Sequence, residues 1–199
     1  MQKILALMVL TLLCSACTST LKVTPINAKT GEYATSSRVN KDEILASEQF
    51  KPEYAELLYV KTDMKSGKYN EFFIKSLEQF KTFKQVNDKS AMETLLISRN
   101  LTEKVPSISD LVGLNRLSKE IGPFLIFEPT LEWEGSYSYS ATFKLIDAST
   151  GKAVLVLKRK AFNWSGLDAP LFYPMLNAIG EWSQGKAIST ATEQSKSSH

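Results

Sequence analysis

The sequence predicts an α+β fold, a sandwich of the α/β kind in which one mixed sheet ends in an antiparallel meander and has helices packed on it. Residues 137–147 alternate apolar and polar side chains with a period of two, which is typical of a strand with one buried face. Asp147 and Gly151 then mark a turn, because Asp can bond its own backbone and Gly adopts positive φ at no steric cost. The apolar run over 153–164 returns as the antiparallel partner, and residues 124–133 supply a third strand.

Two shorter strands and a helix are predicted before this meander. The apolar runs over residues 57–60 and 83–86 are typical of inner strands. Asn70, between them, is expected to cap a helix. The apolar residues that follow it recur at helical spacing, at Phe73, Leu77 and Phe80.

Three more helices are predicted from their end signals. Residues 90–93 and 107–110 each match a capping box directly before an apolar stripe. The second of these helices ends at residues 122–123, where Gly and then Pro cannot continue it. Residues 168–170, Asp-Ala-Pro, are typical of a helix start and predict a last helix after the meander.

Residues 1–16 are interpreted as a lipoprotein signal peptide, outside the fold. Lys3 gives a positive start, and residues 4–13 are an apolar core that is too short to cross ~30 Å of hydrocarbon. Residues 13–17 resemble the lipobox of bacterial lipoproteins, which implies cleavage before Cys17 and diacylation of that cysteine. Cys14 stands where the lipobox usually has Leu, and the alternative is a plain secretory signal followed by an incidental cysteine.

The residues around the cysteine also indicate a location. Thr18 and Ser19 resemble the outer-membrane sorting pattern, because no Asp follows Cys17. Acyl chains on Cys17 would hold the protein at the periplasmic face of the outer membrane, since more than one chain gives stable retention. Both cysteines of the chain lie in this leader, so no disulfide is expected in the folded domain.

The remaining chain is predicted to divide into three parts. Residues 17–50 are the acylated cysteine and a polar tether, with a short helix expected to begin at the capping box of residues 40–43. Alternatively, part of residues 18–40 packs on its own domain as an edge strand. Residues 51–185 are predicted to form a periplasmic α/β domain, and residues 186–199 a mobile polar tail.

Charge and histidine content argue against several classes of function. The 24 basic and 21 acidic residues give a net charge of +3, which is too mild for a protein that binds nucleic acid. The only histidine is His199, in the polar tail, so no Ser-His or Cys-His pair and no His/Cys metal cluster is expected. Glycine-rich phosphate loops are also absent from the sequence. We therefore expect no enzyme activity, no catalytic residue, no metal and no cofactor.

One pair of carboxylates is the remaining enzymatic alternative. Glu132 and Glu134 share a parity, so they would stand about 7 Å apart on one face of a strand. Two carboxylates at such spacing can do acid–base chemistry on a sugar. The simpler interpretation places both on a solvent face, paired with Lys144 or Lys158.

Aromatic and basic residues of the meander form a predicted interaction surface. The basic run over 158–160 could contact anionic lipid, lipopolysaccharide or the glycan wall, although a solvated face that protects a sheet edge is the simpler interpretation. Interfaces are enriched in aromatic side chains, and we expect one or two of those in the meander to be exposed. The surface predicted in this way comprises Trp133, Tyr137, Tyr139, Lys158, Arg159 and Lys160.

Three segments carry a family resemblance. They are the strand end at 83–88, the helical stretch that ends at 121–122, and the turn at 147–152, Asp-x-x-Thr-Gly-Lys. Their order resembles the periplasmic domain of CsgG-type curli-secretion lipoproteins, the TolB amino-terminal domain and LpoB-type activators of peptidoglycan synthases. The pattern departs at Lys152, where that group commonly has Glu, and in the first strand, which lacks its usual Pro-Phe ending.

The resemblance implies roles that range from ring-shaped secretion channels to monomeric adaptors. A channel would need a further pair of amphipathic strands, which this sequence does not offer. We therefore expect an outer-membrane lipoprotein that serves an envelope complex as a non-enzymatic adaptor or as an assembly, secretion or wall-synthesis accessory. Its expected partners are the outer membrane, through the acyl chains, and another envelope protein or a second copy of itself. The alternative is a periplasmic lipoprotein that binds a small ligand or glycan.

Overall fold

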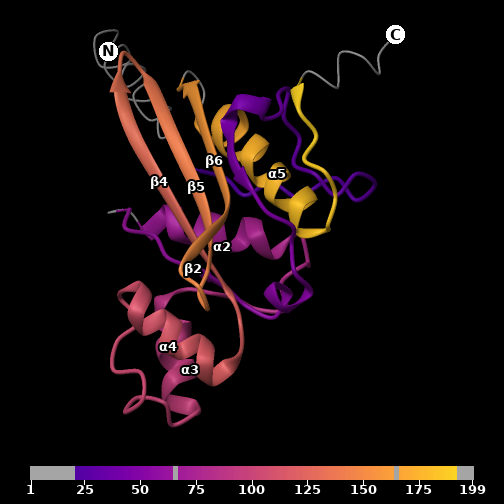
Figure 1. The fold of residues 1–199 in the computed structure, drawn as a ribbon. Helices are drawn as coiled ribbons and strands as arrows, with labels where there is room; N and C mark the ends of the chain where they lie inside the picture. Colours follow the sequence, from indigo (N-terminus) through magenta and orange to yellow (C-terminus); the bar gives the residue numbers. More distant parts are fainter. Residues whose placement is uncertain (1–20, 65–66, 164–165, 192–199) are drawn as a thin grey trace, which may run out of the picture.

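A six-stranded mixed sheet forms the centre of the computed structural model, which describes residues 21–64, 67–163 and 166–191. The strand order is β1-β6-β5-β4-β2-β3, with β4, β5 and β6 as an antiparallel meander and β2 parallel to both β3 and β4 (Figure 1). The predicted fold class is therefore confirmed. The strands are β1 Ile44–Ser47, β2 Leu58–Val60, β3 Val86–Asn87, β4 Leu125–Gly135, β5 Ser138–Asp147 and β6 Lys152–Phe162.

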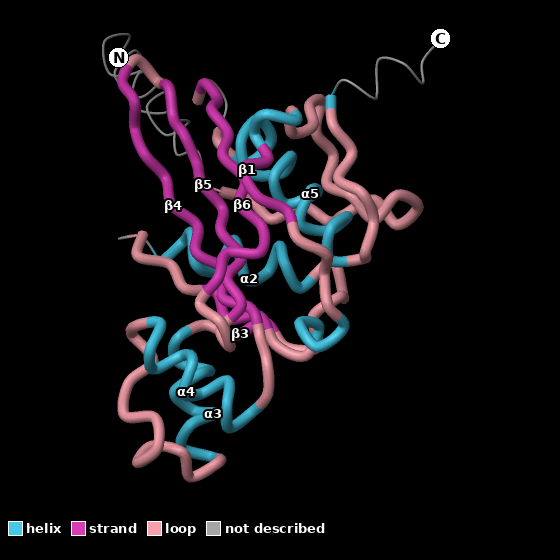
Figure 2. Tube along the Cα trace, in the orientation of Figure 1, coloured by secondary structure: helices cyan, strands magenta, loops and turns pink. Residues whose placement is uncertain are grey.

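Helices cover both faces of the sheet because strand residues alternate in direction. Leu125 and Phe127 of β4 enter a core with α2 and α5, whereas Ile126 between them enters a second core with α3 and α4. Figures 1 and 2 show α3 and α4 at one end of the molecule, with the β4–β5 hairpin projecting from the other. In the described part of the chain, no helix has the length and apolarity needed to cross a membrane. The helices are α2 Gly67–Glu78, α3 Lys89–Ser98, α4 Leu111–Ile121 and α5 Tyr173–Ser183, the last preceded by a π-helical turn, η4 Asp168–Phe172.

The helix starts differ by a few residues from those predicted. Asp88 caps α3 by accepting a hydrogen bond from the Ala91 N–H at 2.8 Å, so Ser90 lies inside the helix. Asp110 caps α4 in the same way, with the Gly113 N–H at 2.8 Å. Asn70 lies within α2 and does not cap it. A carboxylate that directly precedes a helix thus supplies both observed caps, because its oxygens reach the free N–H groups of the first turn.

The turn between β5 and β6 forms as predicted around Asp147 and Gly151. Asp147 is buried, and its carboxylate accepts hydrogen bonds from the Ser149 N–H at 2.8 Å, the Ser149 hydroxyl at 2.6 Å and the Tyr54 hydroxyl at 3.1 Å. Burial alone would raise the pKa of Asp147, but these hydrogen bonds outweigh it and lower the pKa. Gly151 takes a φ of +71°, which the turn requires.

The prediction of a helix after the capping box of residues 40–43 is wrong. Lys41–Glu43 forms only a single 3₁₀ turn, and the chain then enters β1, which pairs antiparallel with β6 at the edge of the sheet. In the strand, Leu45 points outward and is 59% exposed, although helical packing would have turned it inward. The backbone N–H and C=O groups along the edge of β6 explain why a strand forms, because hydrogen bonding to them overrides a local helix signal.

Residues 21–43 are not a tether over their described length. We call them the N-terminal strap, because they pack along the side of the domain. Tyr33 is buried, stacks on Tyr173 with ring centroids 4.5 Å apart, and donates its hydroxyl to the Ser76 carbonyl at 2.7 Å. Its backbone N–H and C=O both bond the side-chain amide of Asn177, at 2.7 and 3.0 Å. Burial raises the pKa of Tyr33 to about 12.

The start of the predicted mobile tail also packs on the domain. Ala191 donates its N–H to the Val39 carbonyl at 3.1 Å, and Ser189 donates its N–H to Glu181 at 2.8 Å. Residues 186–191 therefore lie against the strap and α5, whereas residues 192–199 are outside the described part. The predicted signal peptide and Cys17 are also outside it, so cleavage and acylation remain predictions.

Candidate interaction surface

The most exposed aromatic side chains lie at the projecting end of the meander. Trp133 is 71% exposed, Tyr137 67% and Phe162 56%. The β-ladder brings them together, because Trp133 is the register partner of Tyr139, and Ser138 is the partner of Phe162. We call Trp133, Tyr137 and Phe162, together with Tyr139, the aromatic tip; Tyr139 is partly buried and packs against the core.

Both faces of the hairpin contribute to the aromatic tip. Trp133 and Tyr139 continue the face on which Leu131 and Phe143 pack into the core with α2 and α5. Phe162 lies on the opposite face, since its register partner, Ser138, has the opposite parity to Tyr139. A partner that engages this end therefore meets apolar surface on two sides of a narrow ribbon.

The turn at the end of the hairpin has an unusual backbone. Gly135, Ser136 and Tyr137 have φ values of +96°, +46° and +63°. Tight hairpins of type I′ need positive φ at both central residues and usually use Asn-Gly there, because other residues are strained by about 1–2 kcal/mol each. Strain of this kind is concentrated at functional sites. The turn places Tyr137 at the extreme end of the hairpin.

The predicted basic run divides between two faces. The Lys158 and Lys160 side chains are exposed on the face opposite Arg159, and Lys160 pairs with Glu134 at 2.6 Å. The side chain of Arg159 is only 11% exposed and bonds Glu43 at 2.6 Å. Its other hydrogen bonds are to the Ser37 hydroxyl and to the carbonyls of Arg38 and Pro170. The Arg159 side chain is thus bonded within the domain and is not part of the predicted interaction surface.

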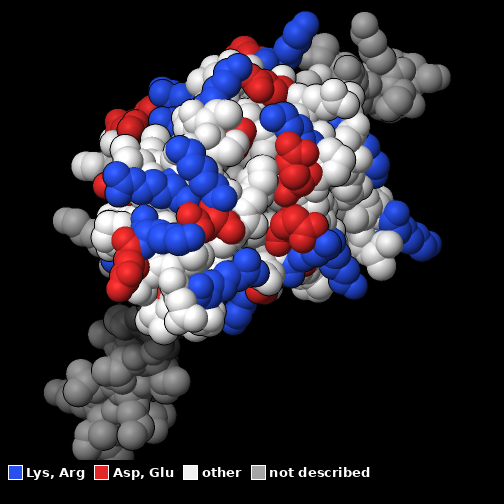
Figure 3. All heavy atoms as spheres, turned by 60° about the horizontal axis from the view of Figure 1, so that its bottom comes forward, with Lys and Arg blue, Asp and Glu red and all other residues white. Residues whose placement is uncertain are grey.

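The carboxylate pair shows no feature of an active site. Glu134 is engaged by Lys160, whose hydrogen bond lowers the pKa of Glu134. Glu132 is exposed opposite Ser140, and neither carboxylate lines the cavity at the carboxyl ends of β2 and β3 or the groove beside α2. Over the surface seen in Figure 3, basic and acidic side chains are interspersed, and no large patch of a single sign covers it. Among the described residues, no group of three His, Cys, Asp or Glu side chains is placed to hold a metal ion.

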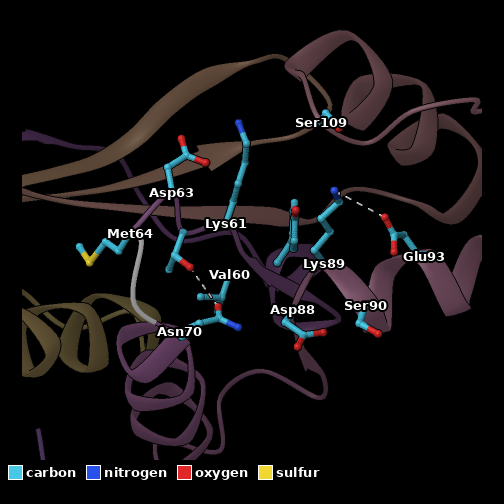
Figure 4. Close-up of a pocket in the computed structure, with 13 residues that line it drawn as sticks. Val60, Lys61, Asp63, Met64, Asn70, Asp88, Lys89, Ser90, Glu93 and Ser109 are labelled. Carbon is cyan, nitrogen blue, oxygen red and sulfur yellow. Dashed lines mark hydrogen bonds and ion pairs between the residues drawn. The ribbon is translucent and has the colours of Figure 1, made fainter. Parts of the chain in front are cut away.

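A polar cavity of about 480 Å³ lies at the carboxyl ends of β2 and β3 (Figure 4). The chain passes from β2 through α2 to β3 on one face, then through α3 and α4 to β4 on the other, so the strand order reverses here. Crevices at such reversal points are the usual ligand sites of open α/β sheets. The charged residues that line the cavity are Lys61, Asp63, Asp88, Lys89 and Glu93.

Ion pairs already neutralise both lysines of that cavity. Lys61 contacts Glu128 at 2.8 Å, and Lys89 lies 3.7 Å from Glu93. Burial, followed by the surrounding carboxylates, raises the pKa of Tyr59 in its wall to about 12. This cavity was not predicted from the sequence, although the polar residues directly after the predicted strand over 57–60 were a usable signal.

Comparisons with known proteins identify similar folds only among solved structures, since no known family and no curated protein matches the chain. The LpoB carboxyl-terminal domain from Salmonella enterica is 12% identical with a TM-score of 0.38, over 55% of this chain and 84% of that one. A PelC dodecamer from Paraburkholderia phytofirmans is 15% identical with a TM-score of 0.37, over 71% and 96%. A lipoprotein from Neisseria meningitidis is 14% identical with a TM-score of 0.33, over 55% and 81%. At these identities and TM-scores the likeness concerns the fold alone.

Proposed function

We propose that this protein is an outer-membrane-anchored periplasmic lipoprotein that serves an envelope complex as a non-enzymatic adaptor or accessory. The aromatic tip is the observation that carries the proposal. Trp133 and Tyr137 are more than two-thirds exposed at the end of a hairpin that projects from the domain. Trp and Tyr are the residues most enriched among those that dominate binding energy at protein interfaces.

The hairpin holds the backbone of these residues in a fixed position. Its two strands are paired from Leu125–Asp147 to Gly135–Ser138, and β6 pairs with the other edge of β5. A segment whose backbone is ordered before binding loses less conformational entropy on contact with a partner. An exposed apolar residue on its own is ordinary, but several at one projecting end indicate a contact site. The partner is expected to be another envelope protein.

Chemical crosslinking in intact cells tests the proposal directly. The tagged, lipidated protein is compared with Trp133→Ser and with Ile97→Ser, which changes a residue that is 67% exposed on α3 at the other end of the molecule. We expect one envelope protein to be recovered with the unchanged chain, and its recovery to fall more than about tenfold for Trp133→Ser, as loss of a dominant contact predicts. Ile97→Ser should recover it unchanged.

The Cys17→Ala variant separates the anchor from the tip. If the lipid anchor concentrates the protein beside its partner, recovery should also fall in this variant, although the tip is intact. Equal loss of the partner in Trp133→Ser and Ile97→Ser would contradict a role for the tip. Crosslinks between copies of this chain alone would contradict the adaptor role and indicate a homo-oligomer.

The cavity at the ends of β2 and β3 favours a second candidate, a periplasmic small-ligand or glycan-binding lipoprotein. Its volume of about 480 Å³ is within the range of small-molecule sites. A ligand that binds only the folded state raises the melting temperature as its concentration rises. Wall-derived sugars that stabilise the unchanged protein, but not a Lys89→Ala variant, would support this candidate.

A further inference from the structure

The first residues of the N-terminal strap are fixed to the domain. The Tyr173 hydroxyl donates to the Lys22 carbonyl at 2.6 Å and accepts from the backbone N–H and the hydroxyl of Thr24, at 3.2 and 3.0 Å. Gln79, directly after α2, accepts from the Ile26 N–H at 2.9 Å and donates to the Thr24 carbonyl at 3.0 Å. Leu21 itself packs against the core that α2 and α5 share. The chain is therefore held in place from its first described residue.

This attachment limits the distance between the domain and the predicted anchor. Cys17 and Leu21 are separated by four residue steps, and a fully extended chain spans no more than about 3.6 Å per residue. The cysteine Cα therefore lies within about 14 Å of Leu21. This step rests on the proposed acylation of Cys17. If Cys17 carries lipid, the side of the domain around Leu21 is held next to the bilayer.

That side of the domain has the composition of a lipid-facing surface. An open groove of about 550 Å³ is lined by apolar Leu21, Val23 and Phe72 and by the charged residues of α2 at its rim. Lys68 and Lys75 of α2 line the groove, and Lys22, which lies between Leu21 and Val23 in the sequence, is exposed. Lys75 pairs with Glu71 at 2.6 Å, whereas no ion pair is formed by Lys22 or Lys68 within the described residues. Three lysines against one glutamate leave an excess of two positive charges.

We propose that this anchor-side surface, formed by Leu21, Lys22, Val23, Lys68 and Lys75, lies against the membrane and contacts lipid phosphates. Lysines at such a boundary bury their aliphatic stems and keep the ammonium groups at the headgroup level. Positive charge next to an anionic lipid surface is attracted within a Debye length. The short connection to Cys17 supplies the proximity, and the lysines set which side of the domain faces the lipid.

Lysine acylation by an amine-reactive ester, read residue by residue by mass spectrometry, tests the proposal on the full lipidated protein. The protein is reconstituted into vesicles of phosphatidylethanolamine with phosphatidylglycerol and compared with the same protein in detergent. We expect Lys22, Lys68 and Lys75 to react several-fold more slowly in the vesicles than in detergent. Lys144 and Lys158, two exposed lysines of the meander, serve as matched controls and should react equally in both.

A pair of variants tests the role of charge. In Lys22→Glu/Lys68→Glu, Lys75 should lose its protection in the vesicles, whereas in Lys144→Glu/Lys158→Glu it should keep it. If Lys22, Lys68 and Lys75 of the unchanged protein react as fast in the vesicles as in detergent, the proposal is overturned while the adaptor function stays intact. Failure of the protein to float with the vesicles would overturn the lipid anchor, and with it both this inference and the anchored form of the proposed function.

Discussion

Arg159 joins three segments of the chain through one side chain. Its guanidinium contacts Glu43 at 2.6 Å, the Ser37 hydroxyl at 3.0 Å and the Pro170 carbonyl at 3.0 Å, so β6, the strap and the turn before α5 meet at this point. The planar arrangement of several N–H donors is specific to arginine. A lysine at this position has a single ammonium and cannot reach all of these acceptors.

Arg159→Lys should therefore lower the free energy of unfolding by about 2–4 kcal/mol, because buried acceptors lose charged donors. Lys160→Ala is the matched control, since Lys160 is the next residue along β6 and its side chain is 64% exposed. It should cost less than about 1 kcal/mol, as expected for a surface ion pair. Urea denaturation followed by circular dichroism measures both. Equal effects of the two substitutions would show that Arg159 does not join the segments.

The residue scale also shows what alternation along a strand can predict. Arg159 and its two lysine neighbours were predicted as one basic run, but a period of two places Arg159 on the opposite face from Lys158 and Lys160. This separation was readable from the sequence. The acceptors were not, because Ser37 and Glu43 lie more than a hundred residues earlier in the chain.

At the element scale, the β4–β5 turn combines strain with exposure. Replacing Ser136-Tyr137 by Asn-Gly should raise the free energy of unfolding by about 1 kcal/mol or more, because these residues suit two consecutive positive φ values. The same change removes the Tyr137 side chain and should reduce recovery of the partner in the crosslinking experiment. Thermal denaturation measures the first effect.

Ser136→Asn alone separates the two effects, because it relieves part of the strain and retains Tyr137. It should give a smaller gain in stability, with full recovery of the partner. If Asn-Gly destabilises the domain, the hairpin does not have the turn described here. If recovery of the partner is unaffected, Tyr137 takes no part in the contact.

Elements defined by local patterns were predictable, and elements defined by distant contacts were not. The β5–β6 hairpin was predicted because its alternation and the turn residues Asp147 and Gly151 are contained within the segment itself. β1 was missed because Ile44–Ser47 is short and becomes a strand only by pairing with β6. The cap positions were misplaced by two or three residues, because several Ser and Asp residues near each start are equally suitable as caps.

At the scale of the whole molecule, the strap is part of the core. Tyr33→Ala should lower the free energy of unfolding by about 3–5 kcal/mol, as for other buried aromatic residues, because it removes the stack on Tyr173 and leaves a cavity. Ile97→Ala, at a residue that is 67% exposed, should change it by less than about 0.5 kcal/mol. Urea denaturation compares the two. A small effect of Tyr33→Ala would mean that residues 21–43 act as a separate tether after all.

The docked strap also sets the order in which the chain can fold. Tyr33 bonds Asn177 across a sequence separation of 144 residues, and Thr24 bonds Tyr173 across 149. A chain that is made from its amino end cannot form these contacts until α5 has emerged, so the strap stays exposed to proteases and chaperones until then. Contacts between residues so far apart in the sequence slow folding. A chain that ends before residue 173 would therefore leave its amino-terminal segment unprotected, even though the complete meander is already present.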